Sequence, residues 1–234
     1  MQRLARLTLI FAVAFAVLIV TPAFLGGPFA PYPLMSMGDV LDLLTPLVLI
    51  PLYWLLFQIR PDRPPSPRET LLFLVLAALW TEGQGMHLVG NSVGRLVQAL
   101  ADGPVVSLVH FYDEVLSHYL WHFGLVGLSA LLIYRQWNAP FEGQRSGLVL
   151  EIVAGTLHGF NYFVTFVEAQ TTLLGVPFAA GVVGFAAIFG RSRLRQQPIL
   201  AFFFVTCLVA SLCFLGWGLY WRGLPEFSEV GIIR

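Results

Sequence analysis

Residues 198–221 read PILAFFFVTCLVASLCFLGWGLYW and contain no charged side chain. A helix needs about 20 apolar residues to cross the hydrocarbon core of a bilayer, so this segment alone is long enough to span one. Six similar segments precede it, at roughly 7–25, 39–59, 70–90, 115–134, 147–168 and 171–190. The sequence therefore predicts an all-α, polytopic membrane helix bundle with about seven transmembrane helices.

The composition of the whole chain agrees with a membrane location. The 234 residues are 57% hydrophobic and 11% charged, with a mean hydropathy of +0.78, far from the values of soluble domains. Because the connections are short, we predict one transmembrane helical domain over residues 1–234, with membrane lipid as its main partner. A net charge of zero without a basic run indicates no nucleic-acid partner. The absence of lysine excludes a retinal protein that uses a lysine Schiff base.

The arginines predict the orientation of the bundle, because cytoplasmic loops carry an excess of basic residues. With the N-terminus inside, the cytoplasmic side holds ten arginines: Arg3, Arg6, Arg60, Arg63, Arg68, Arg135, Arg145, Arg191, Arg193 and Arg195. Only Arg95, Arg222 and Arg234 fall outside. We therefore expect the C-terminus on the periplasmic or extracellular face of a bacterial plasma (inner) membrane. The first segment also fits a signal peptide, and its removal would leave the downstream orientation unchanged.

One segment repeats an ionisable side chain at every fourth position, from His110 through Glu114 and His118 to His122. Ionisable groups are costly at membrane depth, so such a stripe indicates a function. Four residues of α-helix turn through about 400°, which places His118 and His122 on one face with Cβ atoms about 6 Å apart. His110 is expected to be a packing group near the outer surface.

Ionisable residues on two neighbouring segments are predicted to lie at the same depth. The third segment carries Glu82 and His87 toward its outer end, and the fifth carries His158. All five histidines lie in or beside the third, fourth and fifth segments. This clustering predicts a shared pocket in the outer half of the bilayer.

Histidines with an open coordination position are typical of a catalytic zinc site, in which the metal converts bound water to a hydroxide nucleophile. The predicted ligands of a divalent metal, with zinc favoured and iron as the variant, are His87, His118, His122 and His158. The candidate catalytic residues are Glu82, Asp113 and Glu114 as general bases and Ser117, with Asn91, as a positioning group.

Other polar and aromatic residues are expected to have ordinary roles. Asp113 and Glu114 also fit acids near the start of the fourth helix, where the helix dipole favours negative charge. Asp39 and Asp42 are expected to be exposed or capping carboxylates, and Glu168 a solvated acid at the membrane boundary. The aromatic residues 202–204 are expected to face lipid.

A seven-helix membrane protein with intramembrane His, Asp and Ser is thematically similar to the ceramidase and adiponectin-receptor superfamily of membrane metal hydrolases. Those families combine an SxxxH element and a later Asp with an HxxxH motif near the last helix. In this chain the HxxxH motif, His118 and His122, is central, and the last segment has no histidine. The resemblance therefore implies a class of chemistry and assigns no residue.

Four functions fit these patterns. The first is a metal-dependent membrane enzyme, most simply a hydrolase of a lipid or amphiphile. The second is an ion or proton transporter that uses the same residues. The third is a di-metal oxidoreductase or a b-type haem protein, and the fourth is a structural protein whose polar cluster holds helices together.

Overall fold

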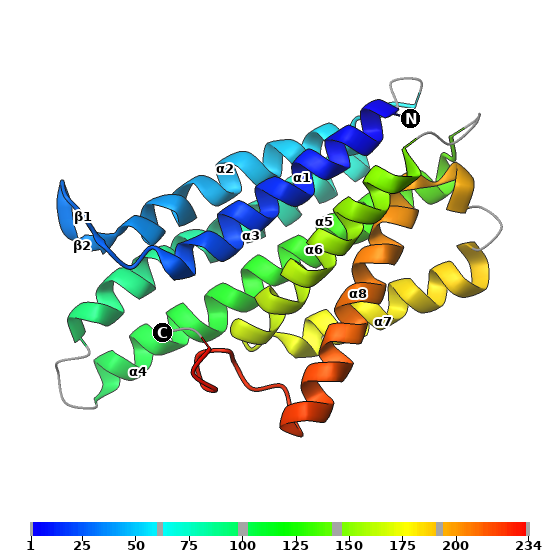
Figure 1. Ribbon diagram of the computed structural model, residues 1–234. Coiled ribbons are helices and arrows are strands. Elements are labelled where there is room, and N and C mark those ends of the chain that lie inside the picture. Colours follow the sequence, from blue (N-terminus) through cyan, green and yellow to red (C-terminus); the bar gives the residue numbers. More distant parts are fainter. Residues whose placement is uncertain (1, 60–62, 98–102, 142–146, 191–193, 233–234) are drawn as a thin grey trace.

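The structure is a computed structural model that describes residues 2–59, 63–97, 103–141, 147–190 and 194–232. It is a bundle of long helices with one small hairpin at an end (Figure 1). The helices are α1 (Gln2–Val20), α2 (Met37–Phe57), α3 (Pro67–Val97), α4 (Pro104–His110), α5 (Ser117–Asn138), α6 (Leu148–Glu168), α7 (Thr172–Phe185) and α8 (Pro198–Trp221). Short 3-10 turns cover Thr21–Phe24 and Leu194–Gln196, and the hairpin pairs β1 (Pro28–Phe29) with β2 (Tyr32–Ser36).

Within the described ranges, seven helices are long and apolar enough to cross a membrane. The predicted class, an all-α polytopic membrane protein, is therefore confirmed. Large apolar side chains on the outer surface, such as Leu173 on α7, Leu219 on α8 and Leu47 on α2, are exposed, as contact with lipid requires.

The fourth membrane segment is longer than its sequence pattern indicated. It starts at Pro104 and runs through α4, a π-helical turn at Phe111–Leu116 and α5 without a break. The expectation that Asp113 and Glu114 lie near a helix N-terminus is therefore wrong, because both belong to the π turn inside a continuous helix. The π turn also interrupts the regular four-residue spacing after His110, whereas Glu114 and His118 still meet one turn apart. Such turns are frequent at functional sites.

Two glycines let α3 and α5 approach each other at backbone distance. A Cβ on Gly83 would lie 2.4 Å from the backbone nitrogen of Trp121, and one on Gly124 would lie 2.6 Å from the carbonyl oxygen of Leu76. Small residues of this kind drive helix association in membranes, where apolar burial does not. This contact fixes the rotation of the two helices and therefore which of their side chains meet.

Polar contacts hold both ends of the bundle. At one end Ser36 and Asp39 form the capping box of α2, and Arg95 at the end of α3 forms an ion pair with Asp39. At the opposite end Arg135 of α5 lies 3.0 Å from Glu69 of α3. Helix α3 is thereby tied to α2 at one end and to α5 at the other.

The two termini lie at opposite ends of the bundle, as an odd number of spans requires (Figure 1). The beginning of α1 and of α3 and the end of α5 share one end, together with Arg3, Arg6, Arg63, Arg68 and Arg135. Arg95 and Arg222 lie at the other end. Arg60, Arg145, Arg191, Arg193 and Arg234 are outside the described residues, and the side of the membrane that each end faces stays a prediction.

Candidate functional site

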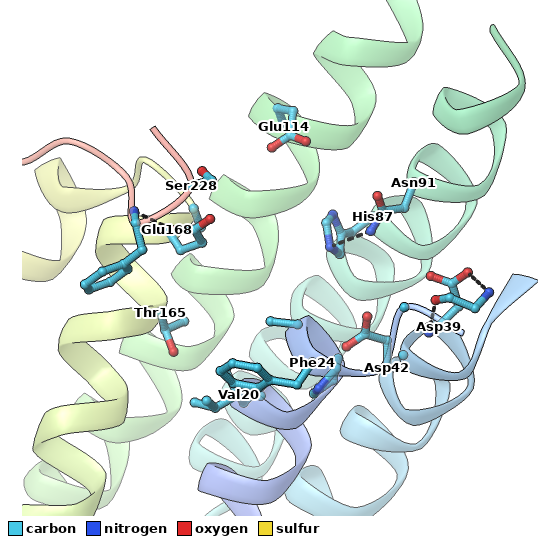
Figure 2. Close-up of a pocket in the computed structure, with 18 of the residues that line it drawn as sticks. Val20, Phe24, Asp39, Asp42, His87, Asn91, Glu114, Thr165, Glu168 and Ser228 are labelled. Atoms are coloured by element: carbon cyan, nitrogen blue, oxygen red, sulfur yellow. Dashed lines mark hydrogen bonds between the residues drawn. The ribbon is translucent and has the colours of Figure 1, made fainter. Parts of the chain in front are cut away.

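A cavity of about 930 Å³ opens at the end of the bundle that is poor in arginine. It lies where α1, α3 and α6 end and α2 begins, beside the π turn of the fourth segment, and the C-terminal residues fold back over it (Figure 2). Its wall has a polar part and an apolar part. The polar part includes Asp39, Asp42, His87, Asn91, Arg95, Glu114, His118, Thr165, Glu168 and Glu226, and the apolar part includes Ile19, Val20, Phe24, Phe160 and Val164.

His87 forms the best-defined polar pair of this cavity. Its Nδ1 lies 2.8 Å from an oxygen of Asp113, whose side chain is only 9% exposed. Asp113 reaches this position because Gly90 of α3 leaves room, and a Cβ there would lie 2.7 Å from the Asp113 Cβ. The other ring nitrogen of His87, Nε2, lies 3.5 Å from the Asn91 amide nitrogen on the cavity wall. Asp113 thus contacts His87 from behind while His87 faces the cavity.

His118 lies beside His87 in the same wall. The two ring centroids are 4.8 Å apart, and His118 Nδ1 is 3.8 Å from a carboxylate oxygen of Glu114. The His118 side chain is only 7% exposed, and its Nδ1 has no hydrogen-bond partner among the described residues. Two imidazoles, each with its own nearby carboxylate, therefore meet at one surface.

His122 follows His118 on the same face of α5, with ring centroids 6.1 Å apart and nearly parallel planes. It is fully buried and does not line the cavity. Its Nδ1 forms a hydrogen bond with the hydroxyl of Thr171, and its ring packs on Phe166. The structure therefore places His122 one turn deeper than the cavity wall.

His158 occupies a different place, between α1, α6 and α8. Its ring stacks on Phe15 with centroids 4.5 Å apart and packs against Phe11, Phe202 and Phe203. No contact with the other histidines is found among the described residues. The expectation that residues 202–204 face lipid is wrong for Phe202 and Phe203, which are buried around His158.

Two of the predicted catalytic residues point elsewhere. Glu82 lies on the exposed side of α3 and does not line the cavity. Ser117 is fully buried, and its hydroxyl donates a hydrogen bond to the backbone oxygen of Asp113 inside the same helix. Of the nine predicted site residues, four line the cavity, namely His87, Asn91, Glu114 and His118, and Asp113 supports it from behind.

The side chains of the cavity wall form an incomplete set of metal ligands. Over the described ranges, no three His, Cys, Asp or Glu side chains are grouped closely enough to hold an ion. Within the described ranges, His87 and His118 are the histidines of the cavity wall; Glu114 lies one turn before His118, and Asp42 faces the cavity from α2. A metal would require at least one of these side chains to rotate.

Sequence reasoning missed several acids of the cavity. Asp42 lies one turn after the capping residue Asp39 and faces the cavity near His87. Glu168, at the end of α6, lines the cavity and accepts a hydrogen bond of 2.8 Å from the backbone nitrogen of Phe227. Glu226 enters from the C-terminal segment. The signal for Asp42 was its place one helical turn from a cap at the predicted outer face.

Comparisons with known proteins identified no relative from which the role of a residue could be inferred. No protein-family model, no curated protein and no solved structure matches the chain.

Proposed function

We propose that this integral membrane protein is a hydrolase of a lipid or another amphiphile, with the cavity at the arginine-poor end as its active site. The observation that carries the proposal is the pair of His87 and Asp113 at a cavity whose wall has a polar part and a larger apolar part. A histidine held by a buried carboxylate is the usual form of a general base. We further propose that this end faces the periplasm or the cell exterior of a bacterium.

His87 would act as the base. Its Nε2 removes a proton from a water molecule, the resulting hydroxide attacks the substrate, and the Asp113 carboxylate stabilises the imidazolium that forms. The His87 imidazolium then gives the same proton to the leaving group, on the wall that it shares with His118. One water molecule is consumed and one bond of the substrate is broken. One product carries the hydroxyl group of that water, and the leaving group carries its proton.

The apolar wall supports an amphiphile as the substrate. Phe24 and Phe160 line the cavity, and much of each side chain is exposed, so we propose that the apolar part of the wall opens toward the lipid around the bundle. An apolar chain in the membrane would therefore reach the cavity without crossing water. Once there, its polar end would lie against His87 and His118 while its tail stayed between α1 and α6.

Isotope labelling tests hydrolysis with a whole lipid mixture in place of one chosen substrate. We expect the full chain in detergent micelles, incubated in H₂¹⁸O with a total membrane-lipid extract, to yield a product that carries ¹⁸O by mass spectrometry. The labelled product should be absent with His87→Ala. Label incorporation that is equal with and without His87 would contradict the proposal.

Metal dependence is the alternative to a His87 base, because one ring nitrogen of His87 cannot bind an ion and accept a proton at once, and it has its own test. A zinc or iron site built on His87 and His118 predicts stoichiometric metal in protein purified without chelators, and a marked loss of it in His118→Ala. Elemental analysis measures both. His158→Ala serves as the control, because His158 lies among aromatic rings and should not change the metal content. Metal-free wild-type protein that still forms the labelled product would rule out metal dependence and support His87 as the base.

A further inference from the structure

The polar wall of the cavity is rich in carboxylates. Asp39, Asp42, Glu114, Glu168 and Glu226 line it and come from four separate parts of the chain: α2, the π turn, the end of α6 and the C-terminal segment. Among the described residues, Arg95 is the arginine of the wall, and it already forms an ion pair with Asp39. His87 likewise faces the buried Asp113. The carboxylates of the wall therefore outnumber its arginine within the part of the chain that the structure describes.

Two of these acids have few partners of their own. Asp42 makes no hydrogen bond or ion pair within the described ranges, although it faces the cavity near His87. Glu114 is 48% exposed, and its contact within that part of the chain is His118 Nδ1 at 3.8 Å, which is beyond hydrogen-bond distance. Each carboxylate can therefore accept contacts from a ligand.

Buried and aromatic groups independently point to a ligand in the same place. The His118 side chain is more than nine-tenths buried and lines the cavity, yet its Nδ1 has no hydrogen-bond partner in the described residues. Trp121, one turn below, also lines the cavity with Phe24 and Phe227. Aromatic faces next to carboxylates are the surroundings that bind ammonium groups.

We infer that the cavity selects an amphiphile with a cationic ammonium headgroup, attracted by the carboxylates of Asp42 and Glu114 on its wall, with its apolar tail along Val20 and Phe24. The inference deepens the proposed function by naming its substrate class. An anionic headgroup would meet unpaired carboxylates at close range, which is unfavourable in surroundings of low dielectric constant.

Binding of simple probes tests the inference without turnover. The full chain in dodecyl maltoside micelles is titrated with dodecyltrimethylammonium, dodecanoate and tetramethylammonium, and tryptophan fluorescence and the thermal midpoint are followed. We expect dodecyltrimethylammonium to bind at least about tenfold more tightly than dodecanoate, because of charge. Tetramethylammonium should bind at least about tenfold more weakly, because it lacks the tail.

Variants separate the cavity from unspecific uptake into micelles. The double variant Asp42→Asn, Glu114→Gln should lose about tenfold in affinity for dodecyltrimethylammonium. Glu69→Gln removes one carboxylate at the opposite end of the bundle and should leave that affinity unchanged. Equal affinities for the cationic and anionic probes, or an unchanged affinity in the double variant, would overturn the inference.

Failure of the inference and failure of the proposed function give different results. His87→Ala should abolish ¹⁸O incorporation and keep dodecyltrimethylammonium affinity within about threefold. If the ammonium probe binds as expected and no lipid is hydrolysed, the headgroup preference stands and the hydrolase fails. If only neutral or anionic lipids are hydrolysed, the hydrolase stands and the headgroup preference is wrong.

Discussion

His87→Ala is expected to lower kcat for amphiphile hydrolysis about 10²- to 10⁴-fold, the usual contribution of a general base. The substitution removes the imidazole that faces the cavity and is held by Asp113 at 2.8 Å. Substrate contacts elsewhere in the cavity remain, so KM should change little. Initial rates of product formation by the purified full chain measure both constants.

Two further variants are measured beside His87→Ala: Asp113→Asn tests the partner of His87, and His110→Ala is the control. Asn at position 113 keeps the shape but cannot stabilise the imidazolium, so kcat should fall while KM stays near the wild-type value. His110 belongs to the same continuous helix but is exposed and outside the cavity, so His110→Ala should keep the wild-type rate. A His87→Ala protein that is folded and as fast as His110→Ala would rule out His87 as the base.

Gly83→Val is expected to destabilise the bundle by about 1–3 kcal/mol, the usual range for overpacking. The added side chain would meet the backbone nitrogen of Trp121 at 2.4 Å and the backbone oxygen of Ser117 at 2.5 Å. Backbone atoms cannot move aside as flexible side chains do, so α5 must shift away from α3. Thermal denaturation in detergent micelles measures the loss.

Gly85→Val is the matched control on the same helix. A Cβ at Gly85 would have no atom within 4 Å, so the free energy of unfolding of this variant should lie within about 0.5 kcal/mol of the wild-type value. Because the α3–α5 contact also sets His87 opposite His118, Gly83→Val should weaken dodecyltrimethylammonium binding, and Gly85→Val should not. Equal melting of the two variants would show that the close helix contact does not carry stability.

The sequence located the helices well because membrane insertion depends on local composition. A run such as residues 198–221 satisfies its backbone hydrogen bonds within itself and its side chains with lipid, so length and hydropathy predict it. The pairing of His118 and His122 on one face followed from helical periodicity in the same way. Neither prediction depended on a neighbouring helix.

The role of each polar residue depended on helix rotation, which the sequence did not reveal. Glu82 was grouped with the histidines by depth, but its neighbour Gly83 packs on α5, and one residue of helix turns the side chain by about 100°, so Glu82 points outward. His158 was at a suitable depth too, yet it faces Phe15 and Phe202. The depth of a residue in the membrane follows from its position along the helix, whereas the direction of its side chain follows from how the helices pack.

Sequence by itself determined that this protein is a membrane helix bundle and that ionisable residues gather in its third, fourth and fifth spans, because both properties are local. Only the tertiary structure decided that Asp113 supports His87, that Glu114 and His118 share the cavity wall, and that Asp42 and Glu168 join them. The physical reason is that glycine contacts between α3 and α5 and the π turn set the rotation of each helix, and rotation decides which side chains meet.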